Sequence, residues 1–186
     1  PAIIEWPAKI KKPRRTSVPC NTSDILPTLL ELAGVTQDKP PPLDGISIVP
    51  LLNDKMKSRE KPMGFWVYPE KGRGKKSRAM LEELRTEQKA GKQKPAPPEG
   101  LIEKRYPLNA YPGPADWIDG DYKLMAGAKK KGDKGRFSLF NLASDAAEKK
   151  DLSKKHPEKV KAMRAGLAAW QKSVLNSLNG NDYSSP

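Results

Sequence analysis

Residues 22–35, TSDILPTLLELAGV, restrict what this chain can fold into more than any other stretch. The polar residues 22–24 offer side-chain oxygens to the free N–H groups that begin a helix. With Asp24 as the helix cap, Pro27 falls in the first turn, where its missing N–H costs no hydrogen bond. Gly34 provides the left-handed residue that commonly ends a helix. The stretch therefore predicts a short helix between Asp24 and Gly34.

This helix is apolar around most of its circumference, because Thr28 and Glu31 are the only polar residues between its ends. Such a helix must be covered on two sides, so we expect it in a protein core. The segment before it, residues 2–6, is AIIEW, with Ile3 and Ile4 adjacent. A continuous apolar run of this kind is typical of a strand buried on both faces of a parallel or mixed sheet.

The C-terminal part of the chain predicts an antiparallel sheet. Residues 63–68, MGFWVY, are aromatic and β-branched, as strands commonly are. In residues 117–125, WIDGDYKLM, the pair Asp119 and Gly120 lies between two apolar ends and indicates a tight turn. Residues 137–142 resume the strand pattern. Two or three short strands need a helix on one face to be stable.

A helix that can cover this sheet begins at Pro157, a residue that suits the first turn. Apolar residues follow at alternating steps of three and four, and Gly180 is expected to end the helix. The predicted core-facing stripe consists of Val160, Met163, Leu167, Trp170, Val174 and Leu178. We interpret this stripe as packing against the sheet.

The chain carries 35 Lys and Arg against 22 Asp and Glu, a formal net charge of +13, which favours an anionic partner. Nucleic acid is disfavoured, because the aromatic residues lie in apolar contexts and are not interleaved with Lys and Arg as base stacking requires. If the densest basic stretches, residues 71–78 and 129–136, project from the same end of the sheet, they form an electropositive rim beside the pocket that attracts a sulfated glycan; the alternative is two solvated loops with no dedicated ligand. No run approaches the roughly 20 apolar residues of a membrane span.

Several motifs in order resemble the sulfatase family of the alkaline-phosphatase-like superfamily. These are a strand that ends in Trp-Pro, a D-hydrophobic-x-P-T-hydrophobic helix that ends in Ala-Gly, the L-D-G-x-S sequence at 43–47 and the leucine pair at 51–52. A second block agrees, with WIDGDYKL at 117–124, LFNL at 139–142 and a closing helix. The resemblance covers most of the chain except an insertion near 70–105.

The resemblance implies an α/β, alkaline-phosphatase-like fold. Residues 1–55 would be the C-terminal end of the large α/β domain. Residues 60–186 would be a small C-terminal subdomain, in which an antiparallel sheet packs on a C-terminal helix and 70–105 is inserted. The implied function is that of a sulfuric ester hydrolase that removes sulfate from a sulfated glycan or an aryl sulfate. The implied partner is the N-terminal part of the same polypeptide, and the implied location is periplasmic or extracellular.

The family's nucleophile is a formylglycine made from a C/S-x-P-x-R motif, and a Ca²⁺ ion held by Asp and Asn polarises the sulfate. Cys20 does not match this motif, because residues 21–24 are NTSD. We expect Cys20 to be a half-buried small residue before the helix. No catalytic, cofactor-binding or metal-binding residue of the family transfers to this chain, so we expect the chain alone to be inactive.

His156 is the only histidine, so a zinc cluster or a triad built on histidine cannot form within the chain. It precedes Pro157 and is expected to be a surface residue at the helix start. Asp44, Asp119 and Asp121 each adjoin a glycine, where we expect local hydrogen bonds to the backbone.

In the family, loops of the small subdomain form one wall of the active-site pocket. The resemblance places Trp66, Tyr68, Tyr111 and Trp117 as candidate wall residues. Family members carry a histidine shortly before the WIDG-like strand, whereas residues 113–116 here are GPAD. The substrate contact of that turn therefore remains open.

Two alternatives to an active sulfatase remain. One is a non-enzymatic basic module that binds a polyanion, which the net charge favours. The other is an inactive sulfatase homologue. Asn21 begins a glycosylation sequon, NTS, that overlaps the predicted helix cap.

Overall fold

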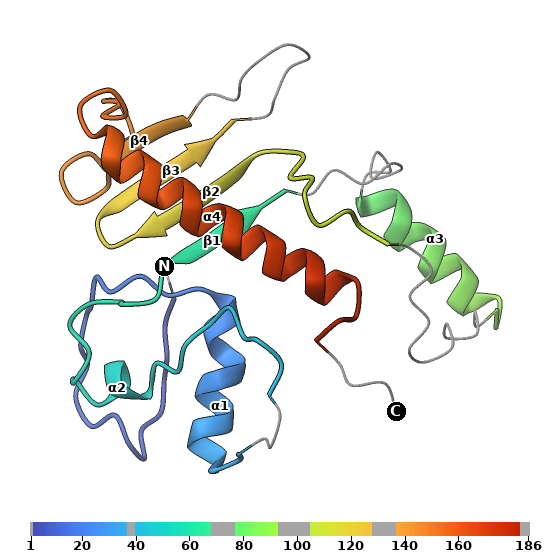
Figure 1. The fold of residues 1–186 in the computed structure, drawn as a ribbon. Helices are drawn as coiled ribbons and strands as arrows, with labels where there is room; N and C mark the ends of the chain where they lie inside the picture. Colours follow the sequence, from blue (N-terminus) through green and yellow to red (C-terminus); the bar gives the residue numbers. More distant parts are fainter. Residues whose placement is uncertain (1, 37–39, 68–76, 93–104, 128–136, 183–186) are drawn as a thin grey trace.

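The computed structural model describes residues 2–36, 40–67, 77–92, 105–127 and 137–182. These residues form a mixed α/β structure, in which one antiparallel sheet packs against a long C-terminal helix and a smaller helical segment precedes the sheet (Figure 1). The α-helices in these ranges are α1 (Ile25–Ala33), α2 (Val49–Leu52), α3 (Ser77–Lys89) and α4 (Pro157–Leu178), and the 3-10 helix η1 (Thr22–Asp24) precedes α1.

The sheet is a four-stranded antiparallel meander in the order β1-β2-β3-β4. Its strands are β1 (Met63–Trp66), β2 (Ala115–Asp119), β3 (Tyr122–Ala126) and β4 (Phe137–Asn141). Asp119 pairs with Tyr122, so Gly120 and Asp121 form a two-residue hairpin loop. Gly120 has a φ of 55°, which glycine adopts without strain. The predicted tight turn and antiparallel sheet are confirmed.

Helix α4 crosses one face of the sheet (Figure 1). The register places Trp117, Leu124 and Leu139 directly opposite one another on neighbouring strands, so all three point to the same face. They form the core with Met163 and Leu167 of α4. The prediction that the C-terminal helix covers the sheet is confirmed.

Near the C-terminal end of α4, the buried residues differ from those that the sequence predicts. Beyond Leu167, the buried residues are Gln171 and Leu175, at steps of four, whereas Leu178 is 42% exposed. The prediction that Leu178 faces the core is therefore wrong. The buried face at this end of α4 carries Gln171 and Leu175, and the predicted positions 174 and 178 lie to one side of it. Gly180, with a φ of 74°, follows the helix as predicted.

The segment at residues 2–6 is not a strand, which corrects the sequence prediction. Ile3 and Ile4 are 96% and 51% exposed. A strand requires a neighbour that accepts and donates its backbone hydrogen bonds, and the described residues offer this segment none. The apolar run is therefore present without the sheet that it was expected to join.

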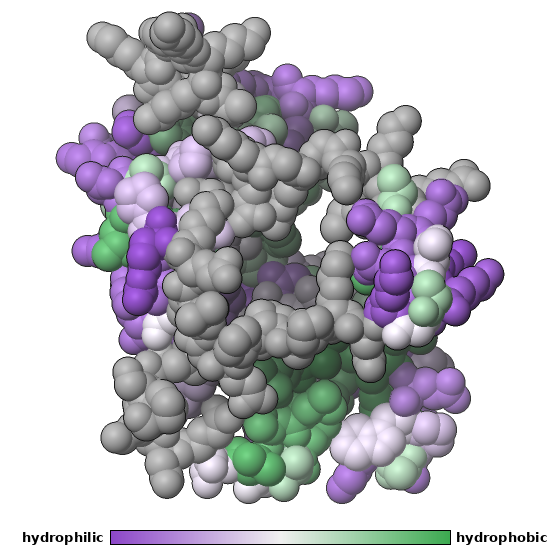
Figure 2. Space-filling view, turned by 90° about the vertical axis from the view of Figure 1, so that its right-hand side faces the viewer, coloured by the Kyte–Doolittle hydropathy of each residue, from purple (hydrophilic) through white to green (hydrophobic). Residues whose placement is uncertain are grey.

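Helix α1 forms as predicted and ends at Gly34, which has a φ of 65°. However, it is not covered within this chain. Ile25, Leu26 and Leu29 are each more than half exposed, and Leu32 is 40% exposed. Figure 2 shows a hydrophobic patch low on the face of the molecule where α1 lies. The expectation that this helix is core is wrong for these residues taken alone.

Helix α3 lies to one side of the sheet (Figure 1), inside the predicted insertion, and Leu81 and Leu84 on it are exposed. The predicted basic rim falls outside the described residues, apart from 77–78 at the start of α3. No helix formed by the described residues combines the length and apolar content that crossing a membrane requires.

Candidate functional site

The strongest polar cluster in the described residues surrounds the carboxylate of Asp24, at the start of α1. The Asp24 residue is 1% exposed and Arg59 is 8% exposed. Arg59 Nη1 donates to Asp24 Oδ2 at 2.8 Å and Arg59 Nη2 donates to Asp24 Oδ1 at 2.9 Å. This two-point geometry is the strong form of an arginine–carboxylate bond. It ties α1 to the loop that leads into β1.

The same carboxylate accepts two backbone hydrogen bonds. Asn21 N–H donates to Oδ2 at 2.9 Å, and Ile46 N–H donates to Oδ1 at 2.8 Å. Asp24 was predicted to cap α1, but its side chain makes no cap bond to that helix. Instead it forms a capping box at the start of η1. The Asp24 side chain accepts from Asn21 N–H, and Asn21 Oδ1 in turn accepts from Ser23 N–H at 3.0 Å.

Thr28 extends the cluster from the next turn of α1. Its hydroxyl donates to the backbone carbonyl of Asp24 and accepts from Ile48 N–H at 3.0 Å. Gly45 permits this close approach of the two segments, because a Cβ there would lie 2.1 Å from the carbonyl oxygen of Ser23. The D-x-x-P-T helix and the L-D-G-x-S loop are thus hydrogen-bonded to each other.

Charge and burial act in opposite directions on the Asp24 carboxyl. Burial acts to raise its pKa, but the hydrogen bonds from Arg59 and from the backbone of Asn21 and Ile46 outweigh burial and lower the pKa below 3.8. Nearby Cys20 has its pKa raised, first by burial and then by the charge of Asp24. Neighbouring atoms partly desolvate its thiol, but the residue as a whole is exposed, which corrects the prediction that it is half-buried.

A second long-range contact joins the L-D-G-x-S loop to α4. Trp170 Nε1 donates to Asp44 Oδ1 at 2.9 Å, across 126 positions of the chain. Asp44 was expected to make local hydrogen bonds in its turn, and this contact is not local. Trp170 also lies against Gly64 of β1, where a Cβ would be 2.4 Å from the indole ring.

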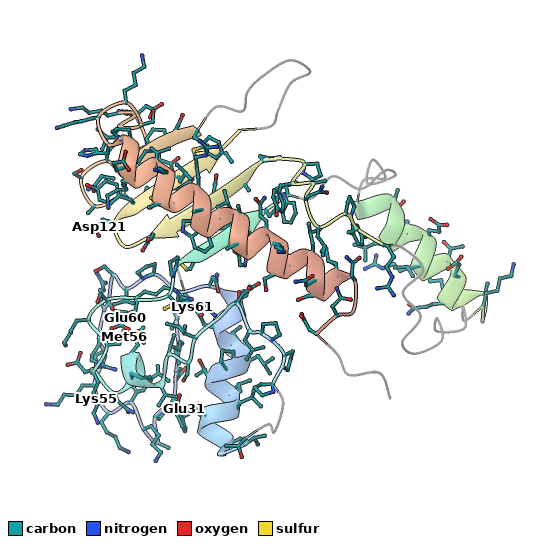
Figure 3. All side chains as sticks on the ribbon, in the orientation of Figure 1. Glu31, Lys55, Met56, Glu60, Lys61 and Asp121 are labelled. Carbon is teal, nitrogen blue, oxygen red and sulfur yellow. The ribbon has the colours of Figure 1, made fainter. Side chains whose placement is uncertain are left out.

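The β2–β3 turn approaches the helical segment from the sheet. Figure 3 shows Asp121 at this turn and Lys61 on the loop that leads into β1. A cavity of about 150 Å³ lies between the turn and residues 17–19 and 57–61. Lys61 Nζ donates to the backbone carbonyl of Leu43, which holds the loop against the L-D-G-x-S segment.

Three of the four candidate wall residues are described. Trp66 and Tyr111 meet edge to face, with ring centroids 6.2 Å apart, and Trp66 Nε1 donates to the carbonyl of Pro112 at 2.8 Å. Trp117 lies in the core, 6.1 Å from Trp170. Tyr68 lies outside the described residues. The structure therefore brings Trp66 and Tyr111 together, and a substrate role for the four residues remains a prediction.

The loop that carries Tyr111 is fixed by a residue that the sequence did not single out. Asn179, at the end of α4, accepts from Tyr106 N–H at 2.7 Å and donates to the Tyr106 carbonyl at 2.9 Å. The Asn179 side chain thus pairs with both backbone groups of Tyr106, as a neighbouring strand does in an antiparallel sheet. It anchors the loop before β2 to the C-terminal end of α4.

On the face of the sheet opposite α4, Lys123 contacts two acidic residues. Its Nζ lies 2.9 Å from Glu148 and 3.3 Å from Asp116. Burial acts to lower the pKa of Lys123, but the two carboxylates outweigh it and raise the pKa. With a lysine at its centre, this group is an ion-pair cluster and not a cation site.

No three His, Cys, Asp or Glu side chains in the described parts of the chain gather as a metal site would require. The described residues therefore do not supply the donor set for the Ca²⁺ ion that the family resemblance implies, and we derive no step through it. His156 is half-buried rather than a surface cap, and its ring meets Tyr122 at 6.3 Å.

Comparison with known proteins gives a distant likeness to solved structures. No protein-family model matches the chain, and no curated protein sequence matches it. A similar solved structure is that of BT4656 in complex with its substrate D-glucosamine-2-N,6-O-disulfate, with 17% sequence identity and a TM-score of 0.43. The match covers 86% of this chain and 24% of that chain. This chain therefore spans about a quarter of the length of the protein that it resembles.

Proposed function

We propose that this chain is the C-terminal portion of a sulfatase-type sulfuric ester hydrolase that acts on a sulfated glycan or an aryl sulfate. The observation that carries the proposal is the contact between two motifs of the family resemblance. Ile46 N–H of the L-D-G-x-S loop bonds to Asp24, and Ile48 N–H bonds to Thr28 of the D-x-x-P-T helix. These two motifs are thus joined by hydrogen bonds to the buried side chains of Asp24 and Thr28, as motifs of a shared architecture would be.

The uncovered apolar surface of α1 supports a larger domain around these two motifs. Ile25, Leu26 and Leu29 are each more than half exposed, and large exposed apolar patches commonly mark interaction surfaces. In the proposed protein, residues 1–55 complete the large α/β domain and the preceding part of the polypeptide covers α1. Residues 60–186, with the insertion at 70–105, form the small C-terminal subdomain.

The chemistry of the proposed enzyme belongs to the preceding part of the polypeptide. The family resemblance assigns the formylglycine nucleophile and the Ca²⁺ ligands to that part, and no residue of this chain takes part in them. The contribution of this chain would be a pocket wall from the β1 end and the loop before β2, with Trp66 and Tyr111 in contact. A periplasmic or extracellular location is part of the same proposal.

The test uses the protein encoded by the complete gene and the 186-residue chain side by side. Both are assayed for sulfate release from an aryl sulfate and from D-glucosamine-2-N,6-O-disulfate, with and without a calcium chelator. We expect the complete protein to release sulfate in a chelator-sensitive way and the chain alone to release none.

Two results would overturn the proposal in different ways. If the upstream sequence encodes no C/S-x-P-x-R motif and the complete protein is inactive, the protein is an inactive homologue or a polyanion-binding module. Retention on immobilised heparin that depends on salt then separates those two readings. If the chain alone turns over an aryl sulfate, its nucleophile lies within residues 1–186 and the assignment of the chemistry is wrong.

A further inference from the structure

A groove separates α4 from the L-D-G-x-S segment, and nothing in the proposed sulfatase chemistry uses it. Its cavity volume is about 310 Å³, at the lower end of the range for small-molecule pockets. One wall is α4, and the other is the start of η1 together with the 42–44 segment. The residues that matter for its chemistry are Asn21, Asp44, Gly166, Ala169, Trp170 and Ser173.

The groove is open because α4 presents small residues to it. Gly166 and Ala169 lie on the groove side of α4. At Gly166 even a Cβ would approach the Trp117 indole to 3.2 Å, so the helix is already in close contact with the sheet there. The open volume therefore lies beside these small residues of α4, and the indoles of Trp117 and Trp170 also line it.

Polar groups converge on the groove from both walls. Asp44 uses Oδ1 to accept from Trp170, and its second oxygen accepts no hydrogen bond from a described residue. Asn21 uses Oδ1 to accept from Ser23 N–H, which leaves its amide N–H₂ for another acceptor. The hydroxyl of Ser173 also makes no hydrogen bond to any residue in the described parts of the chain. Donors and acceptors are thus available together.

We propose that this groove binds a single neutral pyranose ring. The indole of Trp170 offers an apolar surface for the C–H face of the sugar. The carboxylate of Asp44 accepts from ring hydroxyls, and the amide of Asn21 and the hydroxyl of Ser173 donate to or accept from others. The groove includes both Asp44 and Lys61, so its formal charge balances, which favours a neutral hydroxyl-rich ligand over an anion.

This inference does not depend on the proposed sulfatase activity. The groove is built from residues of this chain, and a neutral sugar carries no sulfate. A negative result in the sulfate-release assay therefore leaves it standing, and its failure leaves the proposed activity standing.

The experiment measures binding of methyl β-D-glucopyranoside to the 186-residue chain by saturation-transfer NMR. Cyclohexanol serves as a ring with one hydroxyl, and D-glucosamine-2-N,6-O-disulfate serves as an anionic probe. A small open site predicts a Kd on the order of 1 mM for the neutral sugar. We expect clearly weaker binding of cyclohexanol and no preference for the anionic probe.

Three variants locate the site. Ala169→Leu fills the groove and should weaken sugar binding about tenfold or more. Ala165→Leu makes the same change at an exposed α4 position outside the groove and should leave binding unchanged. Asp44→Asn keeps an acceptor for Trp170 but removes the carboxylate charge, and it should weaken binding several-fold.

Each contrary outcome overturns the proposal. If the wild-type chain shows no saturation transfer to the neutral sugar at concentrations well above the expected Kd, the groove is not a sugar site. If only the sulfated probe binds, and salt abolishes that binding, the groove recognises charge. If Ala169→Leu and Ala165→Leu bind alike, while both give the wild-type tryptophan spectrum, the sugar binds elsewhere.

Discussion

Arg59 holds Asp24 with both of its terminal nitrogens, at 2.8 and 2.9 Å, although 35 positions separate the two residues. Both side chains are almost fully removed from solvent, at 4% and 1% exposure. This ion pair connects the start of α1, the L-D-G-x-S loop and the loop before β1. Since two charges buried together must satisfy each other, the loss of either one leaves the other without compensation.

We therefore expect Arg59→Ala to lower the free energy of unfolding by about 3 kcal/mol or more, the range typical of a broken buried ion pair. Arg59→Lys should recover only part of the loss, because an ammonium cannot make the two-point contact. Urea unfolding followed by tryptophan fluorescence measures both.

The control is Lys57→Ala, which removes one partner of the exposed pair between Lys57 and Asp54. Exposed pairs contribute little to stability, so this variant should match the wild type. An Arg59→Ala protein as stable as Lys57→Ala would show that the buried pair contributes nothing to the fold.

The second prediction concerns acid sensitivity through Asp151. Burial acts to raise the pKa of Asp151, but backbone hydrogen bonds from Ser153 and Leu139, at 2.9 and 3.1 Å, help to lower it to about 2. A carboxyl whose pKa is lowered by folding stabilises the fold above its ordinary pKa of 3.8, and this stabilisation is lost as pH falls through about 2.

Asp151→Asn should consequently be less stable than the wild type at neutral pH, and the difference should begin to close below pH 3.8. Urea midpoints measured across this pH range follow the difference. Asp119→Asn, on the exposed hairpin, is the matched control and should track the wild type. A gap that stays constant down to low pH would mean that the Asp151 charge has no part in stability.

The local patterns predicted the sheet and α4 correctly because the evidence for them is periodic and nearby in sequence. The Asp119-Gly120 turn sets the β2–β3 register, and the apolar steps from Val160 to Trp170 require a covered helix face. The prediction was wrong at the C-terminal end of α4, where Leu175 is buried and the predicted core residue Leu178 is exposed. Sequence spacing allows either leucine to face the core, and only the position of the sheet decides between them.

The third prediction tests the contact between β1 and α4. Gly64→Ala would place a Cβ 2.4 Å from the Trp170 ring, and the ring cannot move without disturbing its bond to Asp44. Overpacking of this kind costs about 1–3 kcal/mol. We expect a loss of that size in thermal or urea unfolding, with a change in the near-ultraviolet circular dichroism of tryptophan.

Gly166→Ala provides the comparison, because its Cβ would lie 3.2 Å from Trp117. There a milder clash is opposed by the gain of about 1 kcal/mol when alanine replaces glycine inside a helix. The two alanine variants should therefore differ clearly in stability. Equal losses would indicate that the Trp170 ring moves aside without cost.

The candidate site was not predictable from the sequence for a physical reason. Arg59 pairs with Asp24, Trp170 bonds to Asp44 and Asn179 pairs with Tyr106, at separations of 35, 126 and 73 positions. No periodicity connects such residues, and only the folded chain brings them together. The sequence marked Asp24 as a helix cap, which located the residue correctly but missed its principal partner.

The last prediction concerns the uncovered face of α1. Leu29 is 57% exposed in this chain. Substitution at an exposed position changes stability by only about 0.5 kcal/mol or less, so Leu29→Lys should leave the unfolding of the 186-residue chain almost unchanged. It should also reduce self-association measured by light scattering, because it places a charge in the apolar patch. In the longer protein that we propose, the same position is covered, and a buried unpaired lysine is strongly destabilising.

Leu178→Lys is the matched control, because Leu178 is a 42% exposed leucine on α4, outside the proposed contact with the preceding domain. It should have little effect in either protein. Hydrogen exchange adds an independent reading. In the isolated chain, the amides of residues 1–52 should exchange faster than those of the sheet and α4, because α1 lacks its cover. If Leu29→Lys destabilises the isolated chain as much as a core substitution does, or if both regions are protected equally, α1 needs no further domain. The proposed division of the chain near residues 55–60 would then be wrong.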